Sequence, residues 1–351
     1  MKTSLRAFLW IATFVGISSC TIKKRVYLKG YYIDWLNFAV TNPNPTKYKF
    51  VSYSLNAYNA LSTKQAQESI INVSEPNEIY CKEGTVVQFP NDAFVYEDGK
   101  AIKCTKVAVY ITEFYAMSDI LESGLTTTSN KRTLFSSGMI YIEASCHGEK
   151  LKLKPGKTIA VSMPTNAYDD KMKVFSGKLR DGIVDWKVNG KVSNSSMPNA
   201  NDLEEGDSLQ FGEGFIDGGT EYFRIGTKEY QDAYLMTTSK LGWINCDRFY
   251  DTKNPTNLLV KVDSVEKTSV ALIFKQMKSV LPGYQYTNNT TEFKGIPLGE
   301  EITILAYRIN EKAKLAIVGK QDMTVGDTSI VQLMMESMPL AEFKSMLKEY
   351  N

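Results

Sequence analysis

Histidine is almost missing from this chain of 351 residues, which contains only His147, and its five cysteines form no C-x-x-C pair. Structural zinc sites need Cys and His at short spacings, so we expect no metal site and no cofactor bound by such residues. His147 directly follows Cys146, and adjacent residues of a strand point to opposite faces, so the two cannot form a catalytic dyad. His147-Gly148 is instead typical of an exposed turn.

The chain also lacks net charge. Its formal charge is +2 at pH 7, and Lys2 and Arg6 account for both units, so the remainder is neutral. A nucleic-acid-binding domain normally carries a basic face, and we therefore expect no nucleic-acid partner. The only tight basic cluster is Lys23-Lys24-Arg25. This cluster either touches anionic lipid headgroups or is a solvated tether.

Long apolar runs are absent except for residues 7–17, which follow a short basic region. That run is too short for a membrane-spanning helix and is typical of a secretory signal. Ile17-Ser18-Ser19-Cys20 resembles the lipobox of bacterial lipoproteins. The resemblance implies that residues 1–19 are removed and that Cys20 carries the lipid anchor, palmitate included. The alternative is an ordinary signal peptide with an incidental cysteine.

Four cysteines remain for disulfides in an exported chain: Cys81, Cys104, Cys146 and Cys246. We favour Cys81–Cys104, which would join two strands across a long turn, and this leaves Cys146–Cys246 as the second pair. Four buried free thiols are the alternative.

Residues 20–77 form an aromatic-rich segment after the anchor. A free linker is poor in aromatic residues, so this segment is expected to pack on the protein's own body or on a partner. Tyr31, Tyr32 and Trp35 are the candidate partner-binding residues. Residues 61–71 are expected to form a short helix.

From residue 78 the pattern is mainly β. Short strand-like runs separated by turns predict a first domain over residues 78–250, and in residues 138–146 the side chains of Ile140, Ile142 and Ala144 should share one buried face with Cys146. A boundary at residues 251–255 precedes a second strand series, which predicts an Ig-like β-sandwich over 251–351. Pro339 opens a short C-terminal helix. The expected architecture is two β-sandwich-like domains in tandem.

The run Gly84-Thr85-Val86-Val87-Gln88-Phe89-Pro90-Asn91-Asp92-Ala93-Phe94 resembles the opening of ZU-type β-sandwiches of ankyrins and netrin receptors. Together with Ser137-Gly138-Met139 and residues 242–249, it looks like uncharacterised Bacteroidota lipoproteins. The resemblance implies an interaction module over residues 78–250. Some ZU-type relatives cleave themselves at His-Phe-Ser; Leu134-Phe135-Ser136 lacks the histidine, so self-cleavage is not expected.

The same resemblance bears on location. In Bacteroidota, acidic residues after the lipidated cysteine resemble a surface-export tag, whereas this chain has Lys23-Lys24-Arg25. The periplasmic side of the outer membrane is therefore expected. Asp207-Ser208-Leu209 and Asp263-Ser264-Val265 look like the O-glycosylation triplet of the phylum, which makes Ser208 and Ser264 candidate glycosylation sites.

Candidate catalytic carboxylates show no informative spacing. Glu113, Glu143 and Asp247 are candidates for glycoside hydrolysis, but no spacing links any two of them, and both glutamates are expected to face solvent or pair with lysine. The acidic residues in 202–207 lack the spacing of a calcium loop, and the glycines at 212–219 lack that of a phosphate loop. Residues 242–249 are expected to form a corner that Cys246 staples and Trp243 packs, with a ligand site as the alternative.

These observations favour a non-enzymatic lipoprotein that serves as an interaction scaffold or as an accessory subunit of a cell-envelope complex. Its partners would be a membrane, through the lipid anchor, and an envelope protein. The alternative is a lipoprotein that binds glycans or small molecules by stacking sugar rings on Trp186, Tyr222 and Tyr284.

Overall fold

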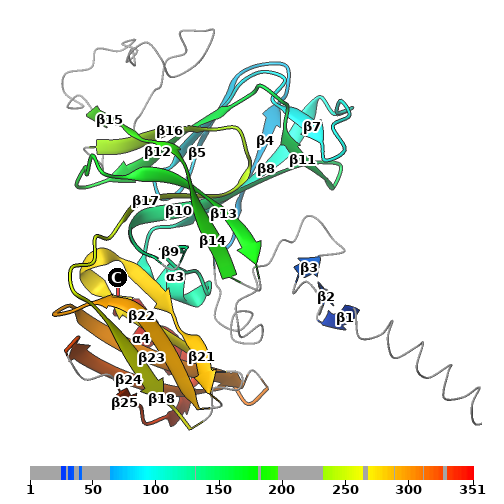
Figure 1. The fold of residues 1–351 in the computed structure, drawn as a ribbon. Coiled ribbons are helices and arrows are strands. Elements are labelled where there is room, and N and C mark those ends of the chain that lie inside the picture. Colours follow the sequence, from blue (N-terminus) through cyan, green and yellow to red (C-terminus); the bar gives the residue numbers. More distant parts are fainter. Residues whose placement is uncertain are drawn as a thin grey trace, which may run out of the picture.

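Figure 1 shows the fold in a computed structural model. The structure describes residues 64–130, 132–180, 183–196, 232–263, 268–287, 289–310, 312–326 and 330–351. Nearer the N-terminus it gives only the backbone of an antiparallel three-stranded sheet, β1 (Arg25–Leu28), β2 (Tyr31–Asp34) and β3 (Ala39–Thr41). The described part is mainly β, and one short helix lies at the C-terminus, as predicted.

The N-terminal domain consists of a nine-stranded and a five-stranded sheet. The nine-stranded sheet contains β4 (Gln67–Asn72), β7 (Phe94–Tyr96), β8 (Lys106–Phe114), β9 (Thr128–Ser129), β10 (Arg132–Cys146), β11 (Glu149–Leu153), β13 (Lys173–Arg180), β14 (Ile183–Lys191) and β17 (Gly242–Phe249). The five-stranded sheet contains β5 (Asn77–Tyr80), β6 (Val86–Phe89), β12 (Ile159–Thr165), β15 (Ser193–Ser196) and β16 (Asp232–Thr238).

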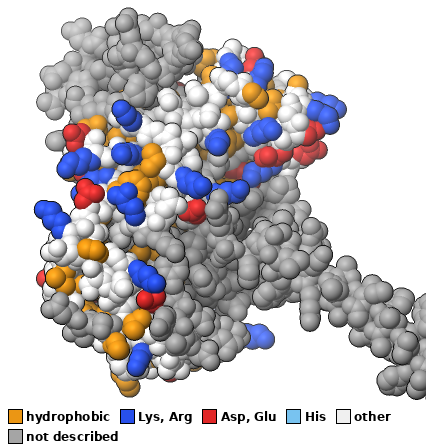
Figure 2. Space-filling model, in the orientation of Figure 1, with side chains coloured by type: hydrophobic (Ala, Val, Ile, Leu, Met, Phe, Trp, Pro, Cys, Tyr) orange, Lys and Arg blue, Asp and Glu red, His pale blue; other side chains and the backbone are white. Residues whose placement is uncertain are grey.

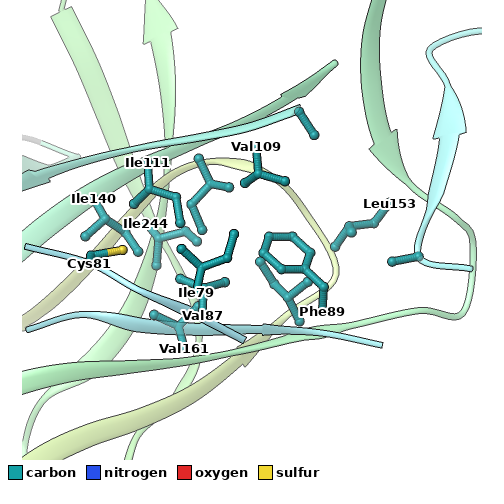
Figure 3. Close-up of a cluster of buried hydrophobic side chains, with 14 of the residues drawn as sticks. Ile79, Cys81, Val87, Phe89, Val109, Ile111, Ile140, Leu153, Val161 and Ile244 are labelled. Carbon is teal, nitrogen blue, oxygen red and sulfur yellow. The ribbon is translucent and has the colours of Figure 1, made fainter. Parts of the chain in front are cut away.

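The first core fills the space between these two sheets. In β10, Ile140, Ile142, Ala144 and Cys146 all point into it, which confirms the predicted face. Figure 3 shows β-branched and aromatic side chains, such as Val87 and Phe89, meeting this face from the other sheet. Alternating burial along β8 follows the same two-residue period, as expected for strands that cover a core.

The C-terminal domain is a second sandwich. Its four-stranded sheet contains β18 (Pro255–Lys261), β21 (Tyr284–Thr287), β22 (Thr290–Pro297) and β25 (Ile330–Gln332). Its five-stranded sheet contains β19 (Ser269–Phe274), β20 (Ser279–Pro282), β23 (Glu301–Asn310), β24 (Leu315–Thr324) and β26 (Glu336–Pro339). Apolar residues from both sheets, including Val260, Phe293, Leu272 and Ile304, form a separate core between them.

A third core joins the two domains. It lies on the outer face of the nine-stranded sheet, and its members include Trp186 and Trp243 from the N-terminal domain and Leu305 and Val318 from the C-terminal domain. The helices α3 (Met117–Glu122) and α4 (Leu340–Lys348) also contribute to it and contact each other, and Figure 1 shows α3 where the two domains meet. The four sheets therefore form one continuous stack with three apolar layers.

Tight packing at this junction depends on Gly177 of β13. A Cβ atom at this position would lie 2.5 Å from a methyl group of Val184 and 2.6 Å from Cβ of Trp243. The missing side chain therefore lets Trp186 and Trp243 approach, and their rings meet edge to face at 6.2 Å between centroids.

Hydrogen bonds also cross the junction. The amide of Thr127 donates to the carbonyl of Val280 at 3.0 Å, and the amide of Val280 donates to Oγ1 of Thr127 at 2.9 Å. The amide of Ser118, in α3, donates to Oδ1 of Asn351 at 2.9 Å. These hydrogen bonds fix how the two domains align, because a shift would leave buried polar groups with neither a protein partner nor water.

The helix expected over residues 61–71 is wrong where the structure describes that segment. Gln67–Asn72 is strand β4, which pairs antiparallel with β8 and buries Ile71 in the first core. Pairing with an existing sheet edge decides the conformation of this run, since local helix propensity is a weak preference. The predicted C-terminal helix is confirmed as α4, which follows Pro339 and buries Phe343 and Leu347.

Among the described residues, no helix has the length and apolar character needed to cross a bilayer.

The shared core predicts that the domains unfold together. Leu305→Ala and Phe343→Ala each remove a side chain with no solvent exposure from the junction. We expect each to lower the free energy of unfolding by about 3–5 kcal/mol, because a cavity remains in a packed core. Urea unfolding followed by tryptophan fluorescence and by far-UV circular dichroism should give coincident, shifted transitions.

The matched control is Met334→Ala, whose side chain is 76% exposed and should change the free energy by less than about 0.5 kcal/mol. Two separate transitions, with tryptophan signals unaffected by Phe343→Ala, would contradict the shared core.

Candidate functional site

A cleft among the described residues lies on the C-terminal domain, on the face of the five-stranded sheet that also borders the junction. Its volume is about 390 Å³. Three separate segments line it: Lys275 and Gln276 of the 3₁₀ helix η1 (Lys275–Met277), residues 301–303 of β23, and residues 322–324 of β24.

Strand register brings the polar side chains of this cleft together. Thr303 is paired with Asp322, and Glu301 is paired with Thr324. On the other side of β23, Thr303 is paired with Ile273, so Lys275 follows two residues later beside Glu301. The Thr303 hydroxyl donates a hydrogen bond to the Asp322 carboxylate. The floor of the cleft therefore alternates carboxylates with hydroxyls.

Tyr350, after α4, lies beside this floor. The ammonium groups of Lys275 and Lys320 are each 5.4 Å from the centre of its ring, within the range of cation–π contacts. Burial, reinforced by the negative charge of Asp322, raises the pKa of Tyr350 to about 12. Its hydroxyl is buried and lies close to Thr303.

This arrangement offers hydrogen-bond donors and acceptors within one small volume. Lys275 and Gln276 can donate, Glu301 and Asp322 can accept, and the threonine hydroxyls can do either. Opposite charges lie side by side, so no single sign dominates the cleft. No residue of this cleft was selected from the sequence, because its members come from three segments that only the strand register brings together.

The predicted cysteine pairing is wrong. Cys104 is bonded to Cys146, with their Cα atoms 6.1 Å apart, whereas Cys81 and Cys246 are buried free thiols. The antiparallel pairing of β8 with β10 places Ser145 opposite Ala108, which brings the segment before β8 to the end of β10. Cys246 is opposite Gly138, eight residues from Cys146 along β10. That separation is roughly 26 Å along the strand, far beyond disulfide range.

His147 lies in the turn that connects β10 to β11, exposed and with a positive φ of 50°, as predicted. Its ring nitrogen and the sulfur atoms of Cys104 and Cys146 lie within 4.8 Å of one another. Both sulfurs are committed to the disulfide and are not available as thiolate ligands. This grouping therefore does not form a metal centre.

Both glutamates are buried, so the expectation that they face solvent is wrong. The alternative, a lysine partner, fits Glu143, because the positive charge of Lys150 acts on its carboxylate. Glu113 accepts hydrogen bonds from the backbone amides of Glu83, at 2.8 Å, and Thr85, at 3.0 Å. Its carboxylate therefore ties the turn before β6 to β8. Glu143 is 6% exposed, and loss of hydration raises its pKa to about 7, an effect that the positive charge of Lys150 opposes.

Asp247 is also buried, in β17, with no exposed surface. The Asn245 amide donates to its carboxylate at 2.5 Å, and Ser136 contributes a further hydrogen bond. Burial raises the pKa of Asp247 well above its ordinary value, and these two hydrogen bonds oppose the rise. A carboxyl group enclosed in this way cannot reach a substrate without opening the sheet.

The run Gly242–Phe249 is not a stapled corner. It forms the central strand β17, paired with β10 on one side and β13 on the other, and Cys246 makes no disulfide. The predicted packing role of Trp243 is confirmed, since its ring lies 4.7 Å from that of Tyr141 and 5.5 Å from that of Phe114.

The residues proposed for sugar stacking are not available as a set. Trp186 has no exposed surface, and its Nε1 donates to the carbonyl of Thr126 at 2.7 Å. Tyr284 belongs to β21, but its side chain lies outside the described residues, as does Tyr222. Trp186 is therefore a structural residue of the domain junction.

The other candidate residues cannot be placed. Cys20, Trp35, Ser208 and Ser264 lie outside the described residues, as does the acidic run 202–207. Tyr31 and Tyr32 belong to β2, for which the structure gives the backbone alone. Lipidation, partner binding and glycosylation at these positions stay predictions.

Disulfide mapping tests the observed connectivity. A non-reducing digest analysed by mass spectrometry should give one linked peptide pair, joining Cys104 to Cys146. Cys104→Ser combined with Cys146→Ser should lower the free energy of unfolding by about 2–4 kcal/mol, because the bond closes a long loop with a sequence separation of 42.

Dithiothreitol should then destabilise the original protein but not the double variant, while Cys81→Ala keeps the sensitivity to reductant. Recovery of a Cys81–Cys104 peptide would overturn this connectivity.

The buried Glu143 carboxyl predicts a pH-dependent stability. Because its pKa rises from 4.5 to about 7 on folding, the folded state holds the proton more tightly between those values. Its contribution to stability is therefore full below about pH 4.5 and is lost as the pH rises through about 7. Glu143→Gln should gain stability relative to the original protein across this window, as urea unfolding at several pH values can measure.

Glu149→Gln, at an exposed position on the adjacent β11, is the control and should follow the original protein at every pH. A stability difference between Glu143→Gln and the original protein that does not vary with pH would show that Glu143 does not titrate in this way.

Comparisons with protein families, with curated proteins and with solved structures found no match. The resemblance of residues 84–94 to ZU-type domains therefore stays a prediction, and no family is assigned.

Proposed function

We propose that this protein is a non-enzymatic, membrane-anchored lipoprotein that acts as an interaction scaffold or accessory subunit of a cell-envelope complex. Its body would be held at the outer membrane, on the periplasmic side, by a lipid on Cys20. The observation that carries the proposal is the apolar junction through which the two β domains form one rigid unit.

A filled junction disfavours ligand capture between domains. Proteins that close around a ligand have hinges and an open space between their domains. Here Trp186 and Leu305 occupy that space and are fully buried, while Thr127 and Val280 are joined by two hydrogen bonds across it. Recognition would then take place on the outer surfaces, which a rigid unit presents in a fixed geometry.

The acidic residues considered for catalysis have structural roles. Glu113 is saturated by two backbone amides, and Asp247 is sealed within the sheet. These placements support an interaction role over glycoside hydrolysis at those residues.

The disulfide and the surface charge support the proposed location. Disulfides form and persist in oxidising compartments such as the bacterial periplasm. The Cys104–Cys146 disulfide is therefore consistent with an exported protein. Figure 2 shows basic and acidic side chains interspersed on the face in view, without a broad field of one sign. Membrane attachment would then depend on the acyl chains of Cys20 and, to a lesser degree, on Lys23-Lys24-Arg25.

Co-purification tests the partner-binding part of the proposal. Tyr31→Ser, Tyr32→Ser and Trp35→Ser together should abolish recovery of a specific envelope protein from a native membrane extract, at least about tenfold below the original protein, because aromatic residues dominate interface energies. The thermal unfolding midpoint of the body should stay unchanged. Partners are identified by quantitative mass spectrometry.

Tyr80→Ser, at a position that is 43% exposed on the body, is the matched control and should keep the partner. Cys20→Ala separates anchoring from partner binding: it should move the chain from the membrane fraction to the soluble fraction. Full recovery of the partner with the triple variant would reject the docking role of the aromatic segment.

A further inference from the structure

We propose that the cleft between η1, β23 and β24 is a binding site for a neutral, hydroxyl-rich ligand, a saccharide of one or two sugar units. This site is independent of the aromatic segment and of the proposed scaffold role. It does not include Trp186, which is fully buried and cannot stack on a sugar ring.

The floor of the cleft provides alternating hydrogen-bonding groups. Glu301 and Thr324 form one cross-strand row, and Thr303 and Asp322 form the next, with Lys275 and Gln276 along one edge. The Thr303 hydroxyl is already oriented, because it donates to Asp322. The acceptor oxygens of the floor and the donors of the edge thus face one small volume of about 390 Å³.

The charges of the cleft favour a neutral ligand. An anion would approach two carboxylates, Glu301 and Asp322, and a metal ion would approach the ammonium groups of Lys275 and Lys320, which flank Tyr350. Within the described part of the chain, the one cluster with metal-ligand geometry is the disulfide and His147. Either kind of ion therefore meets repulsion in addition to the loss of its own hydration.

A hydroxyl group suits these surroundings, because it donates and accepts at the same time. Each ligand hydroxyl could donate to Asp322 or Glu301 and accept from Lys275 or Gln276. The Tyr350 hydroxyl is buried beside Thr303 and Asp322, next to the floor of the cleft.

Size and packing set the expected affinity. The volume is near the lower end of small-molecule pockets, which suits one or two sugar rings. Tyr350 is 7% exposed and its ring lies beside two lysines, so it adds little stacking area. A site built from hydrogen bonds alone should bind weakly, with a dissociation constant on the order of millimolar.

Saturation-transfer difference NMR on the mature chain tests the site. The probes are glucose, galactose, mannose and N-acetylglucosamine, two disaccharides, and soluble N-acetylated cell-wall glycan fragments, each up to about 100 mM. We expect saturable binding of at least one of them. Free sugars and cell-wall fragments are compared separately, and binding of either source supports the site.

Variants locate the binding. Asp322→Asn and Glu301→Gln keep the side-chain shape but remove the charged acceptors, and each should weaken binding at least tenfold. Glu336→Gln, exposed on β26 of the same sheet, is the matched control and should bind like the original protein. Circular dichroism confirms that each variant is folded.

Three results would overturn the proposal: no saturable binding by any sugar, binding that the cleft variants leave unchanged, or tighter binding of calcium, phosphate or putrescine at the cleft. None of these outcomes affects co-purification through Tyr31, Tyr32 and Trp35, so failure here is distinguishable from failure of the scaffold proposal.

Discussion

Burial of the nine-stranded sheet on both of its faces is the constraint on which the whole molecule depends. Strand β10 shows it most clearly, because Ile140 and Ile142 point into the sandwich while Leu134 and Met139 point into the junction with the second domain. A sheet of this kind cannot be stable as half of an isolated sandwich, since its outer face would present tryptophan and leucine to water. The second domain is thus part of the fold of the first.

Double-sided burial explains the polar residues found inside. Ser136, Asn245 and Asp247 lie where β10 and β17 pair beside a bulge, and each is almost fully buried. Asn245 and Ser136 hydrogen-bond to the Asp247 carboxyl group, and burial raises the pKa of Asp247. Glu113 is also buried, and two backbone amides donate hydrogen bonds to its carboxylate. These carboxyl groups position strands, so a sequence search for catalytic acids finds structural residues.

Features that depend on local sequence patterns were predicted correctly. Features that depend on contacts between distant segments were not. The alternation in Lys106–Phe114 and the single face formed by Ile140, Ile142 and Ala144 are period-two patterns, and both are confirmed. The same pattern cannot show that a second domain covers the opposite face, so Trp186 was expected at the surface although it is fully buried in the junction. The Cys104–Cys146 bond depends on the register of β8 against β10, and the cleft depends on the register of β23 against β24; neither register can be read from spacing along the chain.

The position of the cleft follows from how the junction ends. Along one face of β23 the side chains change from Leu305, fully buried in the junction, to Thr303 and then Glu301; along β24 they change from Val318 to Lys320 and Asp322. Tyr350 lies where the apolar side chains give way to polar ones, with its ring in the junction core and its hydroxyl beside the polar floor of the cleft. The sheet that joins the domains therefore continues beyond their contact as a rigid polar surface. A ligand site there shares the stability of the junction, which is the condition that precise hydrogen-bond geometry requires.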